Sequence, residues 1–220
     1  MSNASKVQLL NAATHLFANQ GYAGTSVQEI AKRAGVNISL VSYHFGGKLG
    51  LYRACLEQLG DSTLASTESC LSSCKNEAEF RVRLEIFVED FLQVHMNNRE
   101  IVKMIFRAEN TETAEIEGVF RQTFIKNANL IIDFLSHAKK RGWLAPDVDP
   151  QAVAATLLGT MAHLVQIDHL SERYFGKTLQ DPKERRNFRD KVLRIVLDGA
   201  ANTPQKKSRK TPPNRKESKT

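Results

Sequence analysis

Hydrophobic residues recur at helical spacing in nearly every segment of this chain that has a readable period. In the clearest run, apolar residues three and four positions apart fall on one face of an α-helix. This run consists of Leu84, Phe87, Val88, Phe91 and Leu92. No stretch alternates apolar and polar residues between the turn pairs that close β-hairpins. The pattern therefore predicts an all-α protein.

Glycine, proline and capping residues divide the periodic segments into separate helices. Gly21, Gly35 and Gly46 are expected to end the first three. The serine-rich stretch 61–73 is predicted to be a helix end followed by a loop, and Pro182 to lie in a polar connection. The expected helices span about residues 5–19, 27–34, 39–45, 48–60, 84–95, 116–135, 150–169 and 186–200.

The net charge of +7 is unevenly distributed along the 220 residues. Residues 1–60 carry +3, residues 61–200 carry −2 and residues 201–220 carry +6. The last segment has no aliphatic residue beyond Ala201, so it cannot bury enough apolar area to offset the entropy of the chain. We expect it to be a disordered basic tail.

Cysteine usage and hydropathy bound the environment of the protein. Three cysteines in a chain without a signal peptide argue against a disulfide framework and for a reducing compartment, by default the cytoplasm. The longest uncharged stretch, residues 151–167, is shorter than the roughly 20 apolar residues that cross a bilayer, so we expect no membrane span.

Chemistry-bearing residues are scattered rather than grouped. Cys70 and Cys74 are four residues apart, but no histidine or third cysteine lies at ligand spacing from them, so we expect inert thiols and no metal. Acidic residues next to histidines, such as Asp133 with His137, lack a nearby nucleophile, oxyanion donor or phosphate loop. We therefore expect neither an enzyme nor a cofactor.

Residues 25–48 have the layout of a helix-turn-helix, in which two short helices are joined by a tight turn containing glycine. The small side chains of Ala31 and Ala34 let the two helices cross closely, and Gly35 supplies the backbone freedom that the turn requires. Asn37 is suited to cap the helix that follows. With Val41 turned inward, the second helix presents short polar and aromatic side chains that fit a DNA major groove of about 12 Å.

The segments that flank this second helix add groups that favour phosphate. Thr25 and Ser26 stand at a helix N-terminus, where free backbone N–H groups and the helix dipole attract an anion. Lys48 begins the next helix, where the same dipole helps. Tyr43 and His44 can each donate a hydrogen bond to the DNA backbone.

The run from Gly21 to Asn37, GYAGTSVQEIAKRAGVN, continues as VSYHFGGK over residues 41–48 and ends with Leu51 and Tyr52. Over about residues 6–56 the chain resembles the TetR family of bacterial transcriptional regulators, with many matches at fixed spacing and no gap. The resemblance implies a homodimer, a three-helix DNA-binding domain at residues 1–50, and a helical effector-binding and dimerisation domain at residues 51–200. It also implies a regulator, most often a repressor, that binds a palindromic operator and is released by a small-molecule effector.

The resemblance assigns DNA contacts residue by residue. Those expected to contact phosphate are Thr25, Ser26, Tyr43 and Lys48. Those expected to face the groove are Gln28, Ile38, Ser39, Leu40, Ser42 and His44, and Asn37 is also expected to bind DNA. Two positions depart from the family pattern, because Ser42 stands where tyrosine is usual and Leu49 where glutamate is usual.

The remainder of the chain is expected to hold the effector and the partner subunit. An apolar or aromatic effector is expected to border His95, Met104, Phe120 and Phe124, although periodicity does not separate a cavity wall from a core. Dimerisation is expected through helices near 152–169 and 186–200, because the first has a small-residue stripe and an apolar stripe. A central buried helix within a monomer would give the same pattern.

A protein of another class remains open at this point. The uncharged reading face and Ser42 are also compatible with a helical small-molecule-binding or interaction protein that does not read DNA sequence.

Overall fold

The computed structural model describes residues 3–108 and 114–200. Within those ranges every regular element is helical and no strand occurs, which confirms the predicted all-α class. The elements are α1 (Asn3–Gly24), α2 (Val27–Ala34), α3 (Ser39–Phe45), α4 (Lys48–Cys70), α5 (Glu77–Asn97), α6 (Arg99–Ala108), α7 (Ala114–Val119), the π-helix η1 (Phe120–Ile125), α8 (Lys126–Lys140), α9 (Pro150–Phe175) and α10 (Pro182–Ala200).

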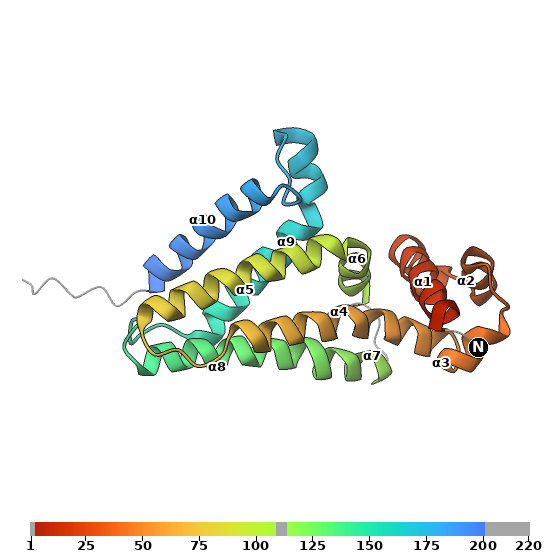
Figure 1. Cartoon of the computed structure of the whole chain (residues 1–220), viewed down its shortest axis with the longest axis horizontal. Coiled ribbons are helices and arrows are strands. Elements are labelled where there is room, and N and C mark those ends of the chain that lie inside the picture. Colours follow the sequence, from red (N-terminus) through yellow and green to blue (C-terminus); the bar gives the residue numbers. More distant parts are fainter. Residues whose placement is uncertain (1–2, 109–113, 201–220) are drawn as a thin grey trace, which may run out of the picture.

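A small N-terminal domain, called the head below, consists of α1–α3 and the first turns of α4 (Figure 1). Its core is apolar and closed, with Leu9, Ile30 and Val41 completely buried. The ring of Tyr52 on α4 lies 4.9 Å from Phe17 and 5.0 Å from Tyr22 between ring centroids. These aromatic contacts hold the start of α4 against α1.

The larger helical domain, called the body below, is built from long helices. Figure 1 shows α4, α5 and α8 lying side by side along the molecule, with α10 set at an angle to them. A second core fills this domain, and its fully buried members include Leu84, Leu92, Ile131, Leu135 and Leu157. The chain therefore has an N-terminal helix-turn-helix domain and a larger C-terminal helical domain.

Helix α6 packs between these two cores. Ile101 and Val102 belong to the core of the body, whereas Met104 is completely buried in the core of the head. Ile105 contacts both cores. A displacement of α6 would consequently change the packing of both cores.

The helix end predicted within residues 61–73 takes up most of that stretch, because α4 continues to Cys70 and only the last residues form the loop. Thr63 and Thr67 turn toward the body and are buried, and the hydroxyl of Thr67 donates to the carbonyl oxygen of Thr63 at 2.9 Å. Because threonines occupy part of its buried face, this stretch of α4 lacks the continuous apolar stripe by which a helix is recognised in a sequence.

Other boundaries also differ from the prediction. The first helical stretch of α1 does end at Gly21 as predicted, because this residue adopts a non-helical φ of 78° and ψ of 171° and kinks the helix, and a short stretch to Gly24 follows. Helix α6 was not predicted, and α9 extends six residues beyond position 169 to Phe175. Pro182 is the first residue of α10, where its missing N–H costs nothing, rather than part of a connection.

The region predicted as one helix over 116–135 contains the π-helix η1 between α7 and α8. Gly60 of α4 faces it so closely that a Cβ atom there would lie 2.6 Å from Cβ of Thr123. Thr123 is buried, and its hydroxyl donates to the carbonyl oxygen of Val119. Glycine at position 60 is thus required for the two helices to approach.

In the described ranges, no helix combines the length and apolar character needed to span a membrane. The predicted basic tail at 201–220 lies outside the described residues.

We expect His95 to make stability depend on pH. Burial lowers the pKa of this imidazole from 6.5 to about 4. Below pH 6.5 the unfolded chain binds a proton there and the folded chain does not, so the free energy of unfolding falls as pH falls toward 4. The loss is at most about 3 kcal/mol. Urea denaturation of wild type and His95→Gln between pH 7 and 4.5 measures this loss. The free energy of unfolding should fall more steeply with falling pH in the wild type than in the variant.

His137→Gln is the control, because His137 is exposed on α8. It should keep the wild-type slope. Equal slopes for wild type and His95→Gln would contradict the burial of a neutral imidazole.

Candidate nucleic-acid interface

The turn between α2 and α3 is fixed by its caps. Ser26 and Glu29 form a capping box, in which the N–H of Glu29 donates to Oγ of Ser26 at 3.1 Å and the N–H of Ser26 donates to the Glu29 carboxylate at 2.9 Å. At the other end Gly35 adopts φ 66°, in the left-handed region, and the N–H of Val36 donates to the carbonyl oxygen of Ala31. Helix α2 therefore begins and ends at fixed residues.

Helix α3 is presented by the turns on both sides of it. The side-chain oxygen of Asn37 accepts from the N–H of Ser39 at 2.9 Å and from its hydroxyl at 2.8 Å, as expected of a capping residue. Gly46 and Gly47 have φ of 71° and 124°, which lets the chain reverse into α4. Val41 is completely buried and sets which face of α3 points outward.

The outward face carries most of the expected groove residues. Tyr43 is 74% exposed and Ile38 is 44% exposed, which is unusual for large apolar side chains. Ser39, Ser42 and Gln28 are also exposed. Leu40 and His44 are half-buried, and Nε2 of His44 lies 3.2 Å from Oγ of Ser5 on α1.

The expected phosphate contacts differ in their surroundings. Lys48 is the first residue of α4, and its ammonium lies over the ring of Tyr22 at 4.4 Å from the centroid. Ser26 is exposed at the start of α2. The side chain of Thr25 is turned inward, since it is 2% exposed and its hydroxyl donates to the carbonyl oxygen of Gly21 at 2.8 Å.

Glu29 is a charged residue of this surface that the sequence reading did not single out. The backbone N–H and hydroxyl of Ser26 both donate to its carboxylate and lower its pKa. It is therefore an anion at neutral pH. The spacing Ser-x-x-Glu at 26–29 is the signal that would have identified the pair.

Of the four expected effector residues, Met104 and Phe124 lie at the core of the head and His95 lies on α5. His95 stacks on Phe91 with ring centroids 3.7 Å apart, and its Nδ1 lies 2.7 Å from the carbonyl oxygen of Phe91. Met104 is in the core of the head, and Phe124 packs against the same core. The structure describes Phe120 by its backbone, in η1.

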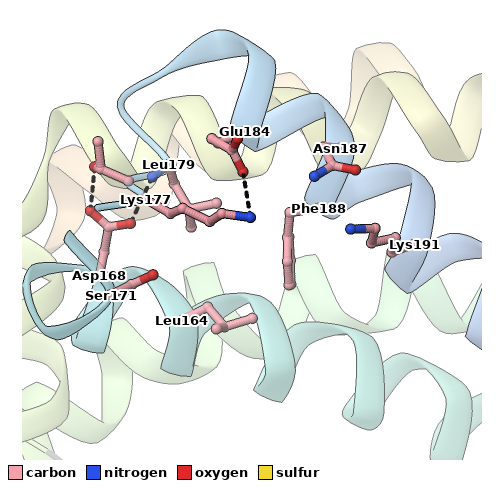
Figure 2. Close-up of a pocket in the computed structure, with 10 residues that line it drawn as sticks. Leu164, Asp168, Ser171, Lys177, Leu179, Glu184, Asn187, Phe188 and Lys191 are labelled. Atoms are coloured by element: carbon pink, nitrogen blue, oxygen red, sulfur yellow. Dashed lines mark hydrogen bonds and ion pairs between the residues drawn. The ribbon is translucent and has the colours of Figure 1, made fainter. Parts of the chain in front are cut away.

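A hollow of about 190 Å³ lies between α9 and α10, and Figure 2 shows the residues that line it. Leu164 and Phe188 line its apolar side. Asp168 closes one end by accepting from the hydroxyl of Thr178 and the N–H of Leu179, both at 2.7 Å. These bonds tie the 176–181 connection to α9, so the hollow is a structural joint.

All three cysteines are free thiols, and burial raises the pKa of Cys55 to about 11. In the part of the chain that the structure describes, no group of three His, Cys, Asp or Glu side chains could hold a metal ion.

The chain is similar to known proteins along most of its length. It is 25% identical to the HTH-type transcriptional regulator RutR of Escherichia coli strain K12 over 197 residues, which cover 90% of this chain and 91% of RutR. Over 52 residues it is 52% identical to the HTH-type transcriptional regulator Mb3439c of Mycobacterium bovis, covering 24% of this chain and 28% of that protein.

A similar fold occurs in the solved structure of the transcriptional regulator FadR from Bacillus subtilis in complex with stearoyl-CoA. The TM-score is 0.70, and the alignment covers 88% of this chain and 98% of that chain at 14% identity. The model of the bacterial regulatory proteins of the tetR family matches residues 9–55, which run from α1 into α4. The helix-turn-helix head therefore matches the tetR family of bacterial regulatory proteins, and the chain as a whole is similar to HTH-type transcriptional regulators.

Proposed function

We propose that the protein is a ligand-responsive transcriptional repressor that binds a palindromic DNA operator as a homodimer and is released by a small-molecule effector. The observation that carries the proposal is the outward face of α3. It is held by a capped α2, a left-handed glycine turn and the buried Val41, and it leaves Tyr43 and Ile38 exposed. A rigid, exposed helix of this size fits the major groove.

Within this proposal the residues divide into two sets. Tyr43 and Lys48 contact phosphate through a phenol and an ammonium, and Ser26 contacts it at the N-terminus of α2, since its hydroxyl already donates to Glu29. Thr25 contributes through the N-terminus of α2, because its hydroxyl is already bonded to Gly21. The residues that enter the groove are Gln28, Asn37, Ile38, Ser39, Leu40, Ser42 and His44.

The two-domain division is also part of the proposal, with residues 1–50 binding DNA and residues 51–200 binding the effector and the partner. Helix α4 crosses that boundary at its third residue, so the division is functional rather than a break in the chain. His95, Met104, Phe120 and Phe124 stay as proposed effector contacts. Because Met104 is completely buried, an effector that reaches it has to displace α6.

The partner subunit is proposed to cover α9 and α10. One face of α9 exposes small residues at helical spacing, among them Ala152, Ala155 and Gly159. Among the described residues, nothing apart from the helix's own backbone and the chain neighbours of Gly159 lies within 4 Å of a Cβ placed there, and Ile195 of α10 is 72% exposed. Two such helix pairs form a four-helix interface around a two-fold axis.

A selection of random DNA duplexes by the full chain tests the proposal directly. We expect enriched sites with two-fold symmetry and half-sites about one helical turn, roughly 34 Å, apart. No preference over bulk DNA at low salt would contradict the regulator and favour a helical binding protein that does not read sequence.

Lys48→Ala should weaken binding to all DNA sequences alike and reduce the slope of log K against log salt by about one. Lys48 is a phosphate contact in this proposal, so sequence preference should not change. The measurement is fluorescence anisotropy over a salt series, with operator and unrelated duplexes. Lys126→Ala on α8 is the control, and it should leave the slope unchanged. An effect confined to one base pair would show that Lys48 reads the groove.

Gly159→Arg should convert the dimer to a monomer that remains folded. The new side chain has open space in its own chain but would clash at a close helix–helix contact with a partner. Light scattering measures the mass and circular dichroism the helix content. Gly118→Arg on α7 is the matched control, because a Cβ there also has no neighbour within 4 Å. A Gly159→Arg dimer would place the interface elsewhere.

A further inference from the structure

A second hollow, called the α6–α9 groove below, lies between α6 and α9 and has a volume of about 410 Å³. It is lined by Arg99, Val102, Lys103, Val165, Gln166 and His169. Val102 and Val165 are buried at 3% and 2% exposure, so they form an apolar floor. The polar lining consists of two permanent cations, an imidazole and an amide, and it contains no carboxylate.

Arg99 of this lining contacts the carboxylate of Asp168, whose negative charge is compensated by several donors. Asp168 accepts from Arg99, from the hydroxyl of Thr178 and from the N–H of Leu179. Its side chain is 1% exposed, whereas that of Arg99 is 35% exposed. The contact with Asp168 uses Nη2 of Arg99, and a guanidinium carries further N–H donors. Asp168 thus fixes Arg99 at the groove without filling it.

Lys103 links the groove to the head. Its ammonium donates to Oδ1 of Asn19 on α1 at 3.0 Å. One turn earlier on α6, Glu100 accepts from Nδ1 of His15 at 2.6 Å. Lys103 therefore lines the groove and also makes one of the polar contacts between α6 and the head.

We propose that the α6–α9 groove binds a small molecule with an anionic group and an apolar part, and that this anion draws Lys103 away from Asn19. The anionic group, a carboxylate or a phosphate, lies between Arg99 and Lys103, and His169 and Gln166 are within the same lining. The apolar part covers Val102 and Val165. The binding site stands without the proposed function, and only its effect on DNA rests on that function.

The coupling follows from competition for one ammonium group. When Lys103 bonds the ligand, its contact with Asn19 is weakened, and α6 is held to α1 by fewer polar contacts. By linkage, anything that weakens the Lys103–Asn19 contact must raise the affinity for the anion. Asn19 is consequently a residue outside the groove that sets the affinity inside it.

Equilibrium dialysis of labelled octanoate against the full chain tests the site. We expect saturable binding that Lys103→Ala weakens at least tenfold, since the variant loses a hydrogen bond between two charged groups. Lys103→Arg should restore most of the affinity because it retains the charge. Lys126→Ala is the matched control, since Lys126 is also a helix-surface lysine with one polar partner, at 3.1 Å.

Two further probes separate the parts of the ligand. Octan-1-ol should bind at least tenfold more weakly than octanoate, and inorganic phosphate should also bind more weakly because it has no apolar part. No saturable octanoate binding, equal binding by Lys103→Ala, or equal binding of octan-1-ol would overturn the site. Inorganic phosphate binding as tightly as octanoate would overturn the apolar part of the proposal.

The octanoate affinity of Asn19→Ala distinguishes a ligand contact from a merely structural role for Lys103, because a structural role would not change that affinity. It should raise octanoate affinity several-fold while leaving circular dichroism unchanged. Lower or unaltered affinity would overturn the competition between ligand and head. DNA binding by the ligand-free protein is measured separately, so a protein that binds octanoate but no operator would contradict the proposed function and leave the site standing.

Discussion

The packing of α6 between two hydrophobic cores is the constraint on which the rest of the structure depends. Met104 is completely buried with residues of the head, and Ile101 and Val102 are buried with residues of the body. A ten-residue helix held on both sides moves only if both cores rearrange, because interiors are close-packed. Polar contacts from Lys103 to Asn19 and from Glu100 to His15 also fix the orientation of α6 against α1. Any ligand that acts on the head from the body has α6 as a direct route.

How much the sequence predicts depends on whether a residue acts locally. Ser26, Gly35 and Asn37 cap or turn their own neighbours, so α2, α3 and the turn between them were predicted within a residue or two. Thr63 and Thr67 depend on what packs against them, so the sequence predicted a helix end in this stretch without fixing that α4 reaches Cys70. Helix α6 was not predicted, although Ile101, Met104 and Ile105 recur at helical spacing, so the signal for this helix was present in the sequence.

The candidate site follows the same division. The exposure of Tyr43 and Ser42 follows from the inward direction of Val41, which the helical period gives directly. The inward turn of the Thr25 hydroxyl depends on Gly21, whose φ of 78° places its carbonyl oxygen within reach. The α6–α9 groove joins residues about 65 positions apart, from Lys103 to His169, and no local pattern in the chain relates them.

Helix α9 presents different surfaces to different partners, and this organises the body. Leu157 and Met161 face the core, Leu164 and Asp168 face the joint with α10, and Val165 with His169 faces α6. Gly159 lies on the remaining exposed face. A partner subunit on that face would hold α9 fixed, so that a ligand between α6 and α9 would move α6 instead. Under that arrangement the free energy of dimerisation and the response to a ligand are coupled, and a monomeric variant would bind the ligand with less effect on its head.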